Sequence, residues 1–289
     1  MRKTEYYFIS TDHLTDCLWF QDNADFKIGM NYVAILAASL NVQVISFILM
    51  SNHVHFVLAG SRPDVVRFIT EFKRRYSSYY HHKYGKREFL RRNDVDIREI
   101  SLENEALERA IAYVQMNSVA ANICAHASLY PWGTGSAFFN SNPRSGKTAS
   151  GFSGSALMRL FHSRESIPGH YLILDSGYVD PMSYVPVDFV EQLFRTPARM
   201  NYFLNSSSKA RARLEEKPTP SFRDQNILAS VSDLCNSLFR VKDYHELQEK
   251  QLSELVRQMR FRFSADVGQL ARVLELPYEE VTRLLNLIE

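Results

Sequence analysis

Two histidines separated by one residue, His53 and His55, stand in an apolar segment rich in β-branched residues. On a β-strand, side chains at positions i and i+2 point to the same face. The two imidazoles are therefore expected side by side, with Val54, Phe56 and Leu58 on the other face. Two neighbouring neutral imidazoles can bind a divalent metal ion. The alternative is a partly exposed sheet face that carries two histidines and no metal.

A tyrosine and an asparagine four residues apart, Tyr113 and Asn117, lie in a segment with helical periodicity. Residues four apart share one face of a helix. A tyrosine hydroxyl can act as a covalent nucleophile, and an asparagine carbonyl oxygen can be a third ligand to a hard cation. The alternative for Tyr113 is a core or boundary position, which is usual for a helical tyrosine.

The elements that must position these side chains follow from hydrophobic periodicity and turn residues. Ser51 and Asn52 suit a tight turn between two strands. The order of elements predicts an α+β fold, a ferredoxin-like antiparallel sheet with helices, followed by an all-helical C-terminal region. The predicted strands span residues 5–13, 42–50, 53–58 and 94–100, and the predicted helices span 23–40, 63–85 and 103–123.

The segment Met50-Ser-Asn-His-Val-His-Phe-Val-Leu58 resembles the hairpin of the single-tyrosine HUH transposases, nearest to the REP-associated tyrosine transposase branch. HUH stands for His, a hydrophobic residue and His. The family's tyrosine helix resembles Tyr113-Val-Gln-Met-Asn-Ser-Val-Ala120, and a further family segment resembles Tyr130-Pro-Trp132. The resemblance covers residues 1–139. The family often has Pro where this chain has Ser118, which leaves the third metal ligand open.

This resemblance implies a DNA transposase that nicks and joins single-stranded, hairpin-containing DNA. Tyr113 would attack a backbone phosphate, form a 5′-phosphotyrosine link and release a 3′-hydroxyl. Mg²⁺ or Mn²⁺, held by His53, His55 and Asn117, would polarise the phosphate. Relatives act as monomers or homodimers, and both states stay open. Two other functions also stay open: a domesticated protein that binds DNA hairpins without transposition, and a metal-dependent small-molecule hydrolase.

A basic stretch over residues 71–92 holds eight Lys and Arg against two Glu. Its net charge of +6 leaves −4 for the rest of a chain whose total is +2. Interleaved tyrosines and cations suit unpaired bases and phosphates, so we expect this stretch to bind DNA beside the metal site. A solvated helix face is the alternative. The expected contacts are Lys73, Arg74, Arg75, Tyr76, Tyr79, Tyr80, Lys83, Lys86 and Arg87.

Two stretches with linker composition, 140–155 and 205–221, divide the rest of the chain. We predict a transposase domain over residues 1–139, a linker and mixed connecting region over 140–250, and a helical module over 251–289. Residues 267–285 resemble a helix-turn-helix in which Arg283 would contact DNA. A plain helical hairpin for packing or dimerisation is the alternative.

The overall composition excludes several classes of protein. Hydrophobic residues make up 45% of the 289 residues, which excludes wholesale disorder. The three cysteines form no CxxC pair, which argues against a disulfide framework or a cysteine zinc site. No apolar run reaches the roughly 18 residues that span a bilayer, and the N-terminus has no signal-peptide pattern. We therefore expect a cytoplasmic protein with no membrane partner.

Overall fold

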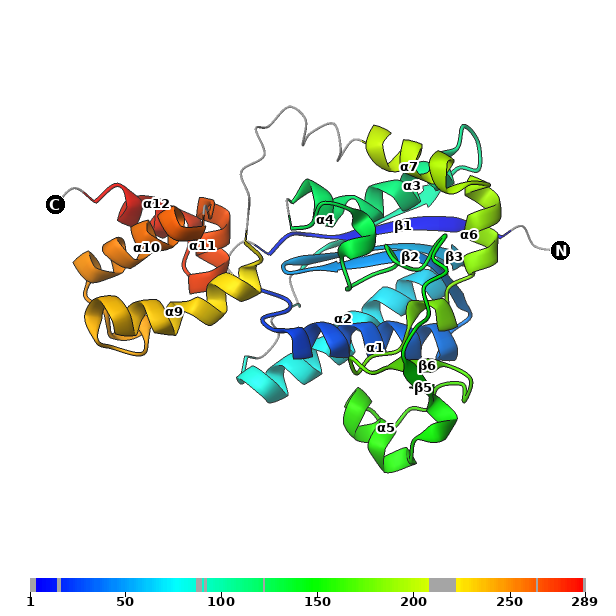
Figure 1. The fold of residues 1–289 in the computed structure, drawn as a ribbon, viewed down its shortest axis with the longest axis horizontal. Helices are drawn as coiled ribbons and strands as arrows, with labels where there is room; N and C mark the ends of the chain where they lie inside the picture. The colour runs from blue at the N-terminus through cyan, green and yellow to red at the C-terminus, as the bar shows by residue number, and fades with distance from the viewer. Residues whose placement is uncertain are drawn as a thin grey trace.

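The computed structural model describes residues 4–14, 17–86, 90, 93–121, 123–207, 222–263 and 265–287. At its centre lies an antiparallel four-stranded sheet with the strand order β2-β3-β1-β4 (Figure 1). The predicted α+β fold is confirmed, and each predicted strand is present with ends that shift by at most two residues. The strands are β1 (Tyr6–Thr11), β2 (Val42–Met50), β3 (His53–Gly60) and β4 (Val95–Ile100).

One face of the sheet is covered by α1 (Asn23–Ser39) and α2 (Arg62–Tyr84), as Figure 1 shows. The Phe56 ring of β3 packs against Phe68 and Phe72 of α2, with ring centroids 5.4 and 5.5 Å apart. This contact fixes the side to which the apolar residues of β3 point. It therefore also fixes the opposite side, to which the histidines of the same strand point.

Local signals set the ends of these two helices. The Asp22 side chain accepts a hydrogen bond from the Asp25 amide at the start of α1. Ser61 accepts one from the Asp64 amide at the start of α2. Such caps satisfy amides that have no partner within the helix. Gly85 ends α2 with a φ of 73°, the left-handed conformation that glycine adopts without strain.

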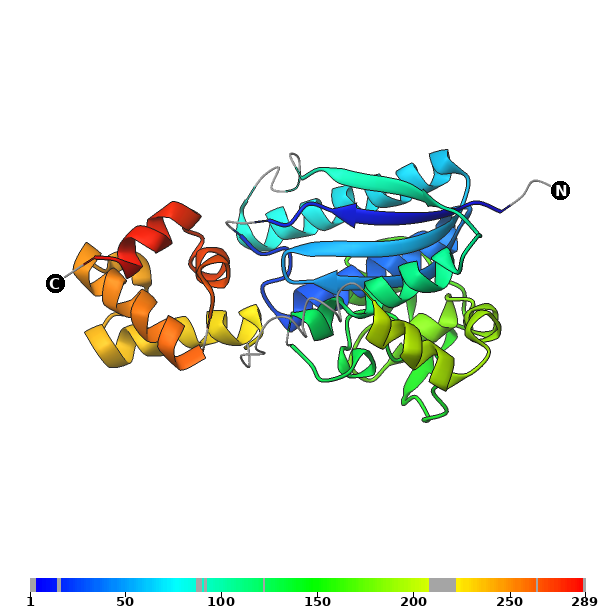
Figure 2. The same ribbon diagram turned by 90° about the horizontal axis from the view of Figure 1, so that it is seen from above.

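The other face of the sheet carries the segment predicted as one helix over 103–123 (Figure 2). The structure divides it into α3 (Ala106–Gln115) and α4 (Asn117–Ala120), with a break at Met116. The Asn117 side-chain nitrogen donates to the carbonyls of Tyr113 (2.9 Å) and Val114 (3.2 Å). An asparagine that bonds to nearby carbonyls competes with the regular helical pattern, which accounts for the break.

After α4 the chain runs along the outer edge of β2. The Leu49 amide donates to the Trp132 carbonyl (2.8 Å), and the Tyr130 hydroxyl donates to the Leu49 carbonyl (2.8 Å). Trp132 stacks on Phe26 of α1 with centroids 5.0 Å apart. The Tyr-Pro-Trp segment therefore belongs to the core.

The region beyond residue 139 continues this core. One apolar cluster runs from Tyr7 to Leu204, so residues 140–204 pack with the sheet. Residues 140–155, which have linker composition, contain β5 and the start of α5. The elements here are β5 (Gly146–Thr148), α5 (Gly154–Phe161), β6 (Leu172–Leu174), α6 (Val187–Phe194) and α7 (Pro197–Ser206), with short 3₁₀ turns at Ala127–Leu129, Ala149–Gly151 and Pro181–Ser183.

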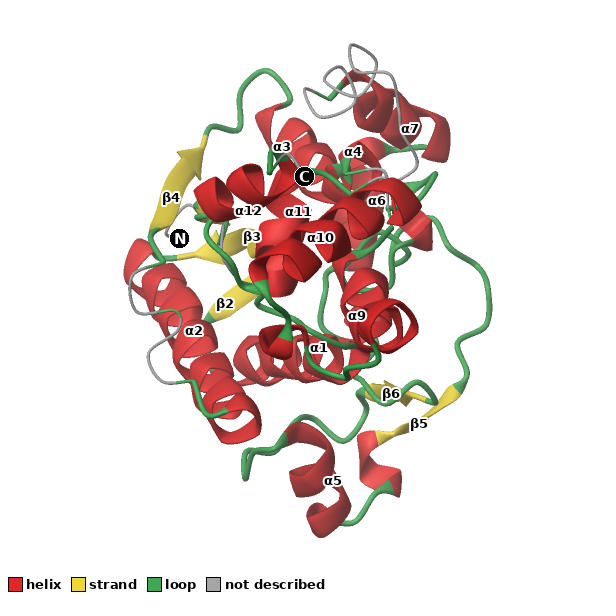
Figure 3. Ribbon diagram, turned by 90° about the vertical axis from the view of Figure 1, so that its left-hand side faces the viewer, coloured by secondary structure: helices red, strands yellow, loops and turns green. Residues whose placement is uncertain are grey.

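A second apolar cluster, from Ile227 to Leu284, joins the helices at the C-terminal end. These helices gather at one end of the sheet (Figure 1), and Figure 3 views the molecule from that end. The domain boundary expected at 250/251 falls inside this cluster, because the helix over residues 224–239 packs with the helices that follow it. The elements are α9 (Asp224–Phe239), a 3₁₀ turn at Tyr244–Glu246, α10 (Glu249–Phe263), α11 (Val267–Leu274) and α12 (Tyr278–Leu285).

Within the described residues, no helix combines the length and the apolar character that crossing a bilayer requires.

Candidate active site

The two histidines of β3 lie on the sheet face opposite α1 and α2. His53 is 5% exposed and His55 is 2% exposed. The His55 ring lies against Phe8 of β1, with centroids 5.6 Å apart, and Ser10 of β1 is its partner in the antiparallel register. His55 is also paired on its other side with Ile48 of β2, and His53 pairs with Met50 of β2.

A third histidine, His13, completes a group that the sequence had not indicated. One ligating nitrogen from each of His13, His53 and His55 can be chosen so that all three lie within 4.8 Å of one another. The His13 ring stacks on the His53 ring at a centroid distance of 3.8 Å. His13 is exposed, so an ion at this group would be accessible to a substrate.

Tyr113, on α3, contacts one histidine of this group. Its ring lies edge-on to His55, with centroids 5.8 Å apart and planes at 82°. It also lies edge-on to Phe8, at 5.5 Å. Phe8 thus holds both rings from β1. Tyr113 is half-buried, which leaves part of its side chain open to solvent.

A cleft of about 610 Å³ opens beside Tyr113. Its walls come from β1, β4, α3 and the end of α7, so the segment after residue 139 contributes directly to the site. Two arginines stand in it, and each has an acidic neighbour: Arg98 lies 2.5 Å from Asp96, and Arg109 lies 3.5 Å from Glu105. The lining residues are Phe8, Ser10, Asp96, Arg98, Arg109, Ala110, Tyr113, Phe203, Ser206 and Ser207.

Asn117, expected as the third metal ligand, is the first residue of α4. It is 3% exposed, and its amide nitrogen turns back to the Tyr113 and Val114 carbonyls of its own segment. Tyr113 and Asn117 lie on either side of the break at Met116, yet the Asn117 side chain still reaches the Tyr113 carbonyl one turn back. The group of three histidines adds His13 as a candidate ligand, and the role of Asn117 stays a prediction.

The basic stretch does not lie beside the histidines, contrary to our expectation. It belongs mainly to α2, which covers the opposite face of the sheet (Figure 1). Its tyrosines are core residues: Tyr76 and Tyr80 are 0% exposed and Tyr79 is 8% exposed. Burial raises the pKa of Tyr76 and of Tyr80 above the ordinary value. Rings enclosed in this way present no face on which a base could stack.

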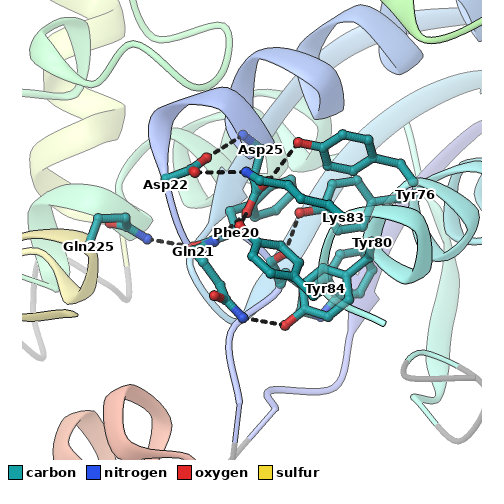
Figure 4. Close-up of polar contacts among 11 residues, drawn as sticks. Phe20, Gln21, Asp22, Asp25, Tyr76, Tyr80, Lys83, Tyr84 and Gln225 are labelled. Carbon is teal, nitrogen blue, oxygen red and sulfur yellow. Dashed lines mark hydrogen bonds and ion pairs between the residues drawn. The ribbon is translucent and has the colours of Figure 1, made fainter. Parts of the chain in front are cut away.

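The Lys83 side chain closes the network shown in Figure 4. It contacts Asp22 and the fully buried Asp25, both at 2.7 Å, and Asp25 also accepts hydrogen bonds from Tyr79 and Tyr84 (2.8 Å each). Burial alone would lower the pKa of Lys83, but its hydrogen bonds to the two carboxylates raise it overall. Lys83 therefore has a structural role in joining α2 to α1.

The other cations of the stretch that the structure describes also have partners within the protein, whereas Arg91 and Arg92 lie outside the described residues. Arg74 pairs with Glu71 at 2.7 Å, and Arg75 pairs with Glu165 at 2.5 Å. Lys73 donates to the Asn93 carbonyl, and Lys86 pairs with Glu275 of the C-terminal helices. Arg87 lies outside the described residues. The charge of +6 is thus partly neutralised where it stands.

The C-terminal helices contain the expected hairpin of α11 and α12. Leu270 and Leu284 are 0% exposed, as their inward positions require. Arg283, expected to contact DNA, pairs with Glu280 at 2.7 Å and also with Glu249. The Arg283 side chain is 48% exposed, and its contact with DNA stays a prediction.

Comparison with solved structures gives a distant likeness. No family model matches the chain, and no curated protein matches it. A solved structure of a REP-associated tyrosine transposase bound to a REP hairpin is similar over 45% of this chain and 75% of that chain. The identity is 12% and the TM-score is 0.35.

Proposed function

We propose that this chain is a metal-dependent enzyme that nicks and joins single-stranded, hairpin-containing DNA, a transposase of the single-tyrosine HUH type nearest to the REP-associated branch. The observation that carries the proposal is the edge-on contact of Tyr113 with His55, at 5.8 Å, beside the group of three histidines. The strand order β2-β3-β1-β4, with both crossover helices on one face, supports a ferredoxin-like domain.

The donor set fits a divalent transition metal. Imidazole nitrogens bind first-row transition ions, of which Mn²⁺ is the weakest binder and, like Mg²⁺, favours oxygen ligands. Of the two ions expected, only Mn²⁺ belongs to this series, so we propose Mn²⁺ with His13, His53 and His55 as its ligands. When bound, such an ion supplies Lewis-acid polarisation of a phosphate oxygen.

The protein's own residues would perform a transesterification. The Tyr113 oxygen attacks the phosphorus of a backbone phosphate and loses its proton. A P–O bond to Tyr113 forms while the P–O3′ bond breaks, and the 3′ oxygen leaves as a hydroxyl after taking up a proton. Joining runs in reverse, since a 3′-hydroxyl then attacks the phosphotyrosine. The number of phosphate ester bonds is conserved, so the reaction requires no nucleotide cofactor.

The cleft beside Tyr113 is the proposed path of the unpaired strand. Arg98 and Arg109 are 74% and 65% exposed in their side chains, and both line the cleft. Exposed guanidinium groups can exchange a carboxylate for a phosphate at little cost, because surface ion pairs contribute about 0–1 kcal/mol. The half-buried Phe8 ring in the same walls offers apolar surface to a base, whereas Phe203 is buried and closes the wall behind it.

Hairpin oligonucleotides labelled at one end or the other test this proposal. With Mn²⁺, a 3′-labelled oligonucleotide should yield labelled protein that survives denaturation, because the link is to a 5′ phosphate. A 5′-labelled oligonucleotide should yield a shorter free strand that a polymerase can extend. Binding without cleavage would instead support the domesticated hairpin-binding protein. Metal-dependent hydrolysis of small esters without any DNA affinity would support the hydrolase.

A further inference from the structure

A buried carboxylate joins the C-terminal helices to the strands that carry the histidines. Asp224, the first residue of α9, is 4% exposed. Its Oδ2 accepts hydrogen bonds from the Ser51 hydroxyl (2.6 Å) and from Arg272 Nε (3.2 Å), and its Oδ1 accepts one from Gln269 Nε2 (2.9 Å). Ser51 lies in the turn between β2 and β3, whereas Gln269 and Arg272 lie on α11. A buried carboxylate with three donors holds both parts to one geometry.

The residue after Ser51 determines which nitrogen of His53 carries a proton. The Asn52 side-chain nitrogen donates to the Leu14 carbonyl (3.0 Å), and the Leu14 amide donates back to the Asn52 carbonyl (3.0 Å). A carbonyl oxygen only accepts, so this contact fixes the orientation of the Asn52 amide. The Asn52 side-chain oxygen then faces His53 Nδ1, 2.9 Å away. Because that oxygen can only accept, Nδ1 holds the proton and the lone pair is on Nε2.

The same two residues also bond to the segment that follows β1, which carries His13. The Ser51 carbonyl accepts a hydrogen bond from the Trp19 amide (2.7 Å), and Leu14 directly follows His13 in the chain. The turn is therefore connected to His53 through the Asn52 amide, to His13 through Leu14, and to the C-terminal helices through Asp224.

From these contacts we infer that Asp224 is a positioning residue of the histidine site, acting through Ser51 and Asn52 to hold His53 with its proton on Nδ1. A metal-binding histidine is commonly held in one tautomer by a hydrogen bond to its other nitrogen. The docking of the C-terminal helices thereby sets the affinity of the site for its ion. This second statement rests on the proposed metal site, whereas the tautomer of His53 is independent of any metal.

Nuclear magnetic resonance of the metal-free, full-length protein tests the inference directly. Long-range ¹H–¹⁵N correlations of the imidazoles distinguish the two neutral tautomers at about pH 8.5, roughly two units above the ordinary histidine pKa. The wild type should show His53 protonated at Nδ1, with the signal identified by its loss in His53→Gln. Ser51→Ala and Asp224→Asn should each increase the fraction protonated at Nε2.

Gln225→Ala is the matched control. Gln225 is the next residue of α9, and its side chain donates to the Phe20 carbonyl (2.8 Å), so it also connects α9 to the first part of the chain (Figure 4). This variant should keep the wild-type tautomer. A Mn²⁺ titration of the same proteins should show affinity reduced about 10- to 100-fold in Ser51→Ala and unchanged in Gln225→Ala.

Each outcome either supports or contradicts the positioning role of Asp224. If Ser51→Ala and Asp224→Asn both remain folded and both keep His53 protonated at Nδ1, the inference is wrong. If one variant unfolds, the other still decides. If the wild type forms no adduct with DNA, the proposed enzymatic function fails, yet a changed tautomer in the two variants would still support the positioning role of Asp224.

Discussion

Replacing His13 by alanine should remove a metal ligand without changing the stability of the fold. His13 is exposed, whereas His53 and His55 are almost fully buried. The substitution removes one imidazole that stacks on His53 at 3.8 Å and creates no cavity in the core. We expect the free energy of unfolding to change by less than about 0.5 kcal/mol, the usual range for an exposed side chain.

The expected loss in metal affinity is much larger than this. Removing a residue that only orients a metal ligand costs about 10- to 100-fold in affinity. Removing one of three direct ligands should cost at least the upper figure, and about 100-fold corresponds to roughly 2.8 kcal/mol of binding free energy. His13→Ala should therefore weaken Mn²⁺ binding strongly while the melting temperature shifts by less than about 2 °C.

The assay is a Mn²⁺ titration, monitored by calorimetry or by the electron paramagnetic resonance spectrum of free Mn²⁺. Thermal unfolding of the same samples measures stability. His82→Ala is the matched control, because His82 is also exposed but lies on α2, across the sheet from the site. It should bind Mn²⁺ as the wild type does. If His13→Ala retains wild-type affinity while His55→Ala loses it, then His13 is not a ligand and the proposed three-histidine site is wrong.

Three further predictions concern stability and DNA binding. Asp25→Ala should lower the free energy of unfolding by roughly 3–5 kcal/mol in a urea titration, because it removes the buried carboxylate that Lys83, Tyr79 and Tyr84 share. A loss below about 1 kcal/mol would contradict the structural role of this network. Burial raises the pKa of Tyr32 to about 12, so the contribution of its neutral hydroxyl to stability is complete below pH 10 and is lost as the pH rises towards 12. The free energy of unfolding should therefore decline less steeply between pH 10 and 12 in Tyr32→Phe than in the wild type. An unchanged slope would refute this. Arg98→Ala should weaken binding of single-stranded DNA and reduce the slope of log affinity against log salt by about 0.7. Arg74→Ala on the opposite face should leave both unchanged, and equal losses in the two variants would refute the cleft as the strand's path.

The sequence predicted those elements whose patterns are strong and local. The strand pair around Ser51 and Asn52 and the end of α2 at Gly85 each follow from a few neighbouring residues. The break at Met116 was missed because hydrophobic periodicity continues through it, and only the bonds of the Asn117 side chain to nearby carbonyls interrupt the helix.

Features that depend on distant parts of the chain were harder to predict. His13 is the last residue of the first predicted strand. The pairing of Ser10 with His55 brings His13 close to His53, and the sequence of one strand alone does not predict that register. The basic stretch was expected beside the site because its composition suits DNA. Composition does not say which face of the sheet a helix covers, and α2 covers the face away from the histidines.

The covalent link itself gives the most direct test of the central claim that Tyr113 is the nucleophile. The adduct with hairpin DNA would be digested with nuclease and trypsin, and the modified peptide would be sequenced by mass spectrometry. The peptide over residues 110–144 also contains Tyr130, whose buried hydroxyl donates to the Leu49 carbonyl, so fragmentation must separate the two. We predict phosphate on Tyr113 in the wild type and no adduct in Tyr113→Phe, which keeps the ring contacts with His55 and Phe8. Phosphate on any other residue, or an adduct that persists in Tyr113→Phe, would contradict the account.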